Sequence, residues 1–149
     1  MPEPRYFEDF HVGEMFETPD RPVSEGEIVA FAETYDPQHF HTDPGAAHAS
    51  VFGTHVASGW HTAAMTMRLW VDHGPSVAGG LIGLGADELR WGPLRPGDRI
   101  RVVGEILETR PSSSGAPRGT IRVRLRTLNQ HDAEVQHMIA TILVPTRPV

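Results

Sequence analysis

The first clear pattern of hydrophobic positions has the period of a helix. Residues 24–36 read SEGEIVAFAETYD, and their apolar members at helical spacing are Ile28, Phe31, Ala32 and Tyr35. Ser24 and Glu27 have the spacing of a capping box, which begins a helix. Pro37 disfavours helical geometry at the residue before it. We therefore predict a helix that ends near Asp36.

A longer helix is predicted for residues 59–73, where Ser58 can cap the start and a Gly-Pro pair follows the end. Apolar residues cover much of its circumference, namely Trp60, Ala63, Ala64, Met65, Met67, Leu69, Trp70 and Val71. Such a helix is normally wrapped by other structure, so we expect both of its tryptophans in the core. A short helix from residue 44 to about 49, capped by Asp43, is predicted before it.

After Gly79 the pattern changes to that of strands. The strand-like segments are residues 81–91, 98–110, 119–130 and 134–146. In the third segment Ile121, Val123 and Leu125 alternate with arginines, which predicts one apolar and one charged face. Residues 110–119, rich in Ser, Pro and Gly, are typical of a long hairpin loop.

Short turns between consecutive strands imply an antiparallel sheet. Turn residues occur at 95–98 and 129–133. Because helices come first and strands later, the sequence predicts an α+β domain with the sheet wrapped around the long helix. The length is normal for one domain, so we expect residues 1–149 to form a single domain.

Composition narrows the possible partners. Hydrophobic residues make up 39%, enough for a core, and the net charge of −6 argues against nucleic acid or an anionic membrane surface as partner. The absence of cysteine excludes disulfides, thiolate nucleophiles and cysteine zinc sites. We see no signal peptide and no apolar run long enough to span a membrane, and we expect a cytoplasmic location.

The candidate chemistry lies in residues 34–44, TYDPQHFHTDP, where Asp36 and His41 share a bend stiffened by Pro37 and Pro44. A carboxylate and an imidazole can remove and deliver protons near neutral pH. Asp36 follows the C-terminal end of a helix, where the dipole disfavours a negative charge, and such a locally unfavourable placement hints at function. An ordinary Asx-Pro turn with a loop histidine is the alternative interpretation.

A metal site is a second alternative, because four further histidines lie nearby: His39, His48, His55 and His61. Zinc needs three or four converging ligands. No HExxH or comparable spacing is present, and His61 has Met65 four residues on. We therefore expect no metal.

These residues resemble the MaoC-like dehydratases, a family of the hot-dog fold that includes the R-specific enoyl-CoA hydratases. The family pattern has an Asp, a His five positions on and a small residue six further on. A Phe-Gly pair and a Gly that opens the central helix follow. The matching positions are Asp36, His41, Ala47, Phe52, Gly53 and Gly59. The resemblance covers roughly residues 5–145.

The resemblance implies a hydratase or dehydratase that adds or removes water at the 2,3-position of a coenzyme A thioester. It implies that Asp36 and His41 activate the water. It also implies that the Gly59 N–H, an unsatisfied donor at a helix start, holds the thioester oxygen. Ser58 and Phe52 are expected beside the substrate. The resemblance further implies no metal or redox cofactor, and a homodimer or a larger homo-oligomer.

Several positions depart from the family pattern. Gln38 and His39 replace an Asn-Pro pair, and Ser58 stands where a His often precedes the helix-opening Gly. Met67, beside Thr66, stands where the family has a serine. An acyl-CoA thioesterase and a non-catalytic acyl-CoA-binding subunit are therefore alternative functions. Gly59 could also serve only to let the helix begin beneath a crowded strand.

The sequence contains no phosphate-binding loop after a strand, so coenzyme A recognition has no motif to mark it. Three arginines could meet its 3′-phosphate, namely Arg90, Arg95 and Arg118. Each is equally typical of a solvated surface charge.

Overall fold

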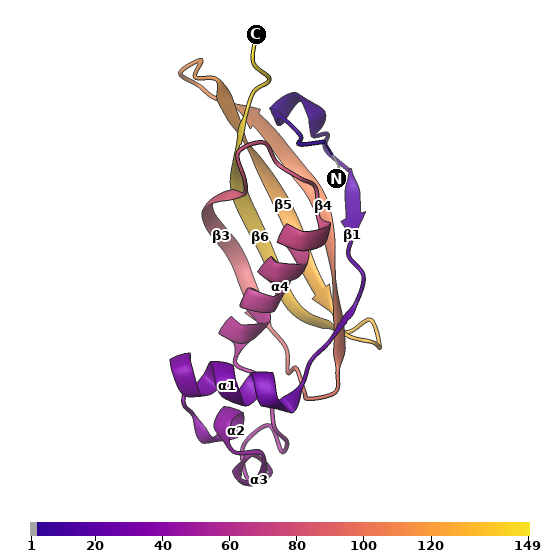
Figure 1. Cartoon of the computed structure of the whole chain (residues 1–149), viewed down its shortest axis with the longest axis vertical. Coiled ribbons are helices and arrows are strands. Elements are labelled where there is room, and N and C mark those ends of the chain that lie inside the picture. Colours follow the sequence, from indigo (N-terminus) through magenta and orange to yellow (C-terminus); the bar gives the residue numbers. More distant parts are fainter. Residues whose placement is uncertain (1–2) are drawn as a thin grey trace.

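Six antiparallel strands form one curved sheet in the order β1-β4-β5-β6-β3, with β2 paired to the end of β4 (Figure 1). The four long strands are β3 (Ile82–Trp91), β4 (Arg99–Pro111), β5 (Arg118–Leu128) and β6 (Glu134–Pro145). These four confirm the predicted strands within a few residues at each end. The structure is a computed structural model and describes residues 3–149.

Two short strands near the N-terminus, β1 (Met15–Glu17) and β2 (Arg21–Pro22), were not predicted. Strands of two or three residues show no periodic pattern, and both exist because β4 offers them hydrogen-bonding partners. A 3₁₀ turn, η1 (Phe7–Asp9), precedes them.

The predicted two faces of β5 are confirmed. Its buried side chains alternate with arginines, the buried ones being Ile121, Val123, Leu125 and Thr127. The arginines lie on the outer face of the sheet and form cross-strand ion pairs, namely Arg122 with Asp87, Arg124 with Glu105, and Arg126 with Glu134. The alternation therefore places the core on the side of the sheet that faces the long helix.

That helix, α4 (Gly59–His73), crosses the inner face of the sheet (Figure 1). Met65, Leu69 and Trp70 are buried against the strands, and burial of such side chains contributes roughly 1.5–3 kcal/mol each. Trp70 lies so close to Gly104 of β4 that a Cβ there would be 2.3 Å from the indole. The α+β architecture, with a sheet around a central helix, is thus confirmed.

The expectation that both tryptophans of α4 lie in the core is wrong for one of them. Trp70 is 3% exposed, but Trp60 is 59% exposed. The sheet covers only one side of α4, and the opposite side presents an apolar row to solvent: Trp60, Ala64, Met67 and Val71. Apolar residues on all sides of a helix predict that it is covered, but they do not show whether the same chain or a second chain covers each side.

The helix α1 (Glu25–Tyr35) ends where Pro37 predicts. Ser24 caps it by accepting a hydrogen bond from the Glu27 N–H, but the reciprocal contact of a capping box is not formed, because the Glu27 carboxylate pairs with Arg21. Tyr35 was expected to continue the apolar stripe, but it is 73% exposed. The stripe ends one turn before the helix does.

Two short helices, α2 (His39–Thr42) and α3 (Pro44–Ala47), follow α1, and the three gather beyond one end of the sheet (Figure 1). Asp43 caps α3 through the N–H groups of its first turn, as predicted. The helix α2 was not predicted, because four residues between two prolines carry no period. Within residues 3–149, no helix is long and apolar enough to span a membrane.

Candidate active site

The side chains of Asp36 and His41 meet at the junction of α1 and α2. Oδ2 of Asp36 lies 3.3 Å from Nε2 of His41. Asp36 is the residue that ends α1, and His41 lies in α2, so the break in the helix at Pro37 turns the second residue back toward the first. The imidazole is almost fully buried, whereas the carboxylate is partly exposed. The two candidate acid–base residues are therefore within reach of one water molecule.

The backbone holds the His41 ring in one orientation. Its Nδ1 lies 2.7 Å from the carbonyl oxygen of Val56. Since a carbonyl can only accept, Nδ1 carries a proton, and in the neutral ring Nε2 has a free lone pair that faces Asp36. On the other side, Nε2–H of His55 donates to the carbonyl of His41. A neutral imidazole and a carboxylate that face each other present two acceptors to a shared water.

Ser58 binds Asp36, although the sequence suggested that it caps α4. Ser58 occupies the N-cap position but makes no capping hydrogen bond, and its Oγ donates to Oδ2 of Asp36 at 2.8 Å. The predicted cap is wrong: the Ser58 hydroxyl is directed to the Asp36 carboxylate, which the end of α1 brings there, and its oxygen accepts no N–H of α4. Ser58 therefore contacts the candidate pair through Asp36, and its place beside a substrate stays a prediction.

The pKa of Asp36 lies below its ordinary value. Burial on its own raises this pKa. The hydrogen bonds from Gln38 and Ser58, and the positive charge of His41 when it is protonated, oppose burial and outweigh it. The Asp36 carboxylate therefore stays ionised at neutral pH, as a group that accepts a proton must be.

The Gly59 N–H opens α4 beside this pair. It donates to no protein acceptor among the residues that the structure describes. The ring of Trp91 lies directly over Gly59, so that a Cβ there would come within 2.3 Å of the indole. Gly59 thus has a free N–H, which an oxyanion donor needs, and it also has a strand residue packed so closely that only glycine fits. The structure is compatible with both roles.

A cavity of about 230 Å³ is lined by both His41 and Gly59, together with Phe40, Phe52, Trp91 and Pro93. Phe52 lines it, packed against Phe40. Aromatic and apolar walls around a few polar groups are typical of small-molecule sites.

The sequence did not mark Trp91 and Gln136 as site residues. The Trp91 Nε1–H donates to Oε1 of Gln136 at 2.8 Å, and Gln136 is 1% exposed. The two residues are direct cross-strand partners at the end of β3. No local pattern could have found them, because a tryptophan and a glutamine 45 residues apart become a pair only through strand register.

The departures from the family pattern lie in different environments. Thr66 is fully buried and bonds Thr127 through the two hydroxyls at 2.6 Å, whereas Met67 is 46% exposed on the open side of α4. Ala47, the small residue of the pattern, is buried at the end of α3. A buried hydroxyl is therefore present one position before the place where the family has a serine.

The remaining candidates do not converge on the pair. His39 and His48 are exposed, and no three His, Asp or Glu side chains among the described residues are placed to share a metal ion. Arg90 pairs with Glu88 on β3 at 3.7 Å. Arg95 and Arg118 form no ion pair within residues 3–149.

Comparisons with known proteins identify the family. The family model described as "MaoC like domain" matches residues 9–127. The MaoC-like dehydratase from Rhodospirillum rubrum is 44% identical, with a TM-score of 0.93 over 97% of this chain and 99% of that chain. The R-hydratase PhaJ1 from Pseudomonas aeruginosa is 26% identical, with a TM-score of 0.74 over 95% of this chain and 86% of that chain.

A relative with an assigned reaction is the 3-hydroxyacyl-thioester dehydratase Z from Mycobacterium tuberculosis. It is 30% identical over 105 residues, which cover 66% of this chain and 68% of that protein. The match of the family model over most of the chain and the nearly complete superposition on a MaoC-like dehydratase agree with each other. The chain belongs to the MaoC-like dehydratase family and has the hot-dog fold.

Proposed function

We propose that this protein adds water to a 2-enoyl thioester of coenzyme A, or removes it from a 3-hydroxyacyl thioester. One observation carries the proposal: Oδ2 of Asp36 and Nε2 of His41 lie 3.3 Å apart, and His41 lines a single cavity with Gly59. A proton-transferring pair and an oxyanion donor are the two elements that the reaction needs. The reaction requires no metal and no redox cofactor.

In the hydration direction, a water held between Asp36 and His41 loses a proton to the pair while its oxygen bonds to the β-carbon. The electrons of the double bond move toward the thioester, and negative charge develops on its carbonyl oxygen. The Gly59 N–H, at the positive end of the α4 dipole, stabilises that charge. The pair then returns a proton to the α-carbon, so that H and OH have been added and the pair has its starting protonation.

A second copy of the chain is the proposed partner. The strand β3 lies at the edge of the sheet and is exposed along nearly its whole length, including Ile82 and Leu84. The apolar row of α4 lies on the uncovered side of the same unit. An unpaired edge strand next to an apolar helix face fits a two-fold contact, in which β3 pairs with its copy and α4 packs on its copy.

The test of the proposal is an assay with crotonyl-CoA, followed by loss of the enoyl absorbance and identification of 3-hydroxybutyryl-CoA. Branched and dicarboxylic enoyl-CoAs extend the panel. Release of free thiol without hydration would instead show a thioesterase. Ligand binding without turnover across the panel would show a non-catalytic subunit, and either result would overturn the hydratase.

A further inference from the structure

The basic residues of this chain are almost all neutralised by the protein itself. All thirteen are arginines. Within residues 3–149, every arginine except Arg95 and Arg118 forms an ion pair with an Asp or Glu side chain. The two exceptions are therefore candidate sites for an anion that comes from outside.

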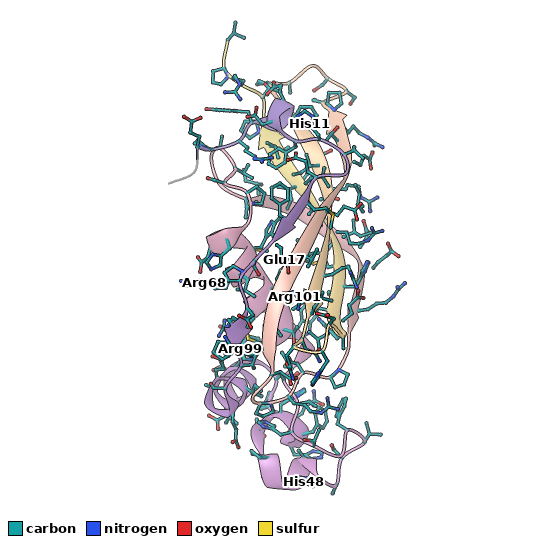
Figure 2. All side chains as sticks on the ribbon, turned by 90° about the vertical axis from the view of Figure 1, so that its right-hand side faces the viewer. His11, Glu17, His48, Arg68, Arg99 and Arg101 are labelled. Atoms are coloured by element: carbon teal, nitrogen blue, oxygen red, sulfur yellow. The ribbon has the colours of Figure 1, made fainter. Side chains whose placement is uncertain are left out.

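Arg95 is surrounded by other polar side chains. It lines a surface cavity of about 260 Å³ together with His48, Thr54 and His55. Neither the Thr54 hydroxyl nor the His48 ring has a hydrogen-bond partner in the described part of the chain. The guanidinium, the hydroxyl and protonated imidazoles all donate to phosphate oxygens, and arginine does so in a bidentate manner. Figure 2 shows His48 at the end of the molecule formed by the short helices.

His55 supplies an independent indication of a ligand. It is only 5% exposed, and its Nε2–H is used by the carbonyl of His41. Its Nδ1 has no hydrogen-bond partner among the described residues. Buried polar atoms without a partner are rare in native proteins. A ligand group in the Arg95 cavity would supply the partner that this nitrogen lacks.

One carboxylate, that of Glu25, also lines the cavity. It forms no ion pair with Arg95 and disfavours an anion by its own charge. Removal of the Glu25 charge should therefore strengthen anion binding, whereas removal of the Arg95 charge should weaken it.

The cavity lies next to the reaction site. The Ala57 N–H donates to the carbonyl of Leu94, which joins the two segments that carry the lining residues of both cavities. His41, Ala57 and Pro93 line the reaction cavity, and the neighbouring residues His55 and Arg95 line the second one. A ligand that extends out of the reaction cavity could reach Arg95 around the edge of these segments.

We propose that the Arg95 cavity binds a phosphate group of the substrate, namely the 3′-phosphate monoester of coenzyme A. The inference rests on the proposed acyl-CoA substrate. A phosphomonoester carries nearly two negative charges at neutral pH, which suits a guanidinium flanked by two imidazoles and a hydroxyl. The 5′-diphosphate of coenzyme A and free phosphate share this chemistry, so the experiment must separate the three.

The binding test uses the full chain and titrates it calorimetrically with adenosine 3′,5′-bisphosphate, with AMP, with ADP and with inorganic phosphate. The bisphosphate should bind most tightly. In Arg95→Gln its affinity should fall about tenfold or more, the usual effect of losing a charge-assisted hydrogen bond. Glu25→Gln should tighten binding, and Arg118→Gln, the matched control that removes the other unpaired arginine, should leave it unchanged.

Several outcomes would overturn the 3′-phosphate assignment. They are no binding of the bisphosphate by the wild type, equal binding by Arg95→Gln, a larger loss in Arg118→Gln, or equally tight binding of ADP or inorganic phosphate. Arg95 is exposed, so its replacement should leave the thermal midpoint unchanged, and that measurement confirms that the variant is folded.

A kinetic test separates this inference from the proposed reaction. With crotonyl-CoA, Arg95→Gln should raise KM about tenfold at unchanged kcat, because the contact is equal in ground and transition states. With crotonyl-dephospho-CoA, the wild type and Arg95→Gln should have the same KM. Equal KM values with crotonyl-CoA would refute the phosphate site. Bisphosphate binding through Arg95 without any hydration would instead refute the hydratase and leave the site standing.

Discussion

One oxygen of Asp36, Oδ2, accepts a hydrogen bond from Ser58 Oγ at 2.8 Å and lies 3.3 Å from Nε2 of His41. It connects the end of α1, the helix α2 and the residue that precedes α4. Ser58 therefore fixes the position of this oxygen, and His41 faces it as the second member of the acid–base pair. Together with the hydrogen bond from Gln38 to Oδ1, these contacts explain why a carboxylate at the unfavourable end of a helix has a lowered pKa and stays ionised.

Replacement of either member of the pair should abolish most of the activity without unfolding the protein. For Asp36→Asn and His41→Gln we expect kcat for crotonyl-CoA hydration to fall by about 10²–10⁴-fold, the usual contribution of a positioned acid–base group. His39→Gln, which alters an exposed histidine of the same helix, is the control and should keep full activity. Unchanged turnover in both pair variants would remove them from the mechanism.

Ser58→Ala should shift the pH dependence of the reaction. The Ser58 hydroxyl stabilises the ionised carboxylate, so its loss raises the pKa of Asp36. Because Asp36 acts in its ionised form, activity is lost as pH falls through that pKa, and in the variant the loss begins at a higher pH. At neutral pH Asp36 is ionised in both proteins, so we expect the difference on the acid side of the profile and little change at neutral pH. The pH profile of kcat/KM measures this shift.

The control for this profile is Ser24→Ala, which removes a helix cap far from the chemistry. It should cost about 1 kcal/mol of stability and leave the acid limb of the profile in place. An identical acid limb in Ser58→Ala and wild type would show that the hydrogen bond does not tune Asp36.

A pair of substitutions at Gly59 isolates its N–H. Gly59→Ala and Gly59→Pro both add a Cβ that meets the Trp91 ring, but only proline removes the amide hydrogen. Proline is well tolerated at the first position of a helix, and Ser58 already has an extended conformation with φ −56° and ψ 138°. We expect kcat of the proline variant to be about 10²–10³-fold below that of the alanine variant. Equal rates in the two variants would assign Gly59 a purely steric role.

His61 should make folding stability depend on pH. Burial lowers the pKa of His61 below its ordinary value, although Glu27 raises it and Arg21 lowers it further. The unfolded chain therefore binds a proton at a pH where the folded chain does not, so stability falls as pH drops below the ordinary histidine value. His61→Phe keeps the stacking on Phe31 and removes the titration. Denaturant midpoints from neutral to acidic pH should fall less steeply in this variant, and equal slopes would contradict the prediction.

The apolar row on α4 should control association. Val71→Glu places a charge at the proposed two-fold contact, and we expect it to convert a dimer into a monomer, as measured by light scattering at micromolar concentration. Val12→Glu is the matched control, because Val12 is at least as exposed as Val71 but lies outside α4 and β3. A wild-type monomer, or a dimer that Val71→Glu does not weaken, would contradict the proposed interface.

The sequence predicted the elements with strong local signals. Four long strands, the helices α1 and α4, and the caps at Ser24 and Asp43 follow from periodicity, capping residues and prolines. The charged face of β5 follows from alternation alone. The short separation between Asp36 and His41, with a proline between them, predicted that the two side chains share one bend. Each of these features depends on residues close together in the chain.

The tertiary structure decided what depends on distant residues. Helix packing brings the Ser58 hydroxyl to Asp36. Strand register and helix packing together place Trp91 over Gly59 and next to its hydrogen-bond partner Gln136. Local pattern also placed Trp60 in the core, and only the packed structure showed that the sheet leaves that side of α4 open. The reason is physical: periodicity reports which side chains avoid water, whereas the identity of the neighbour that excludes the water is set by long-range contacts.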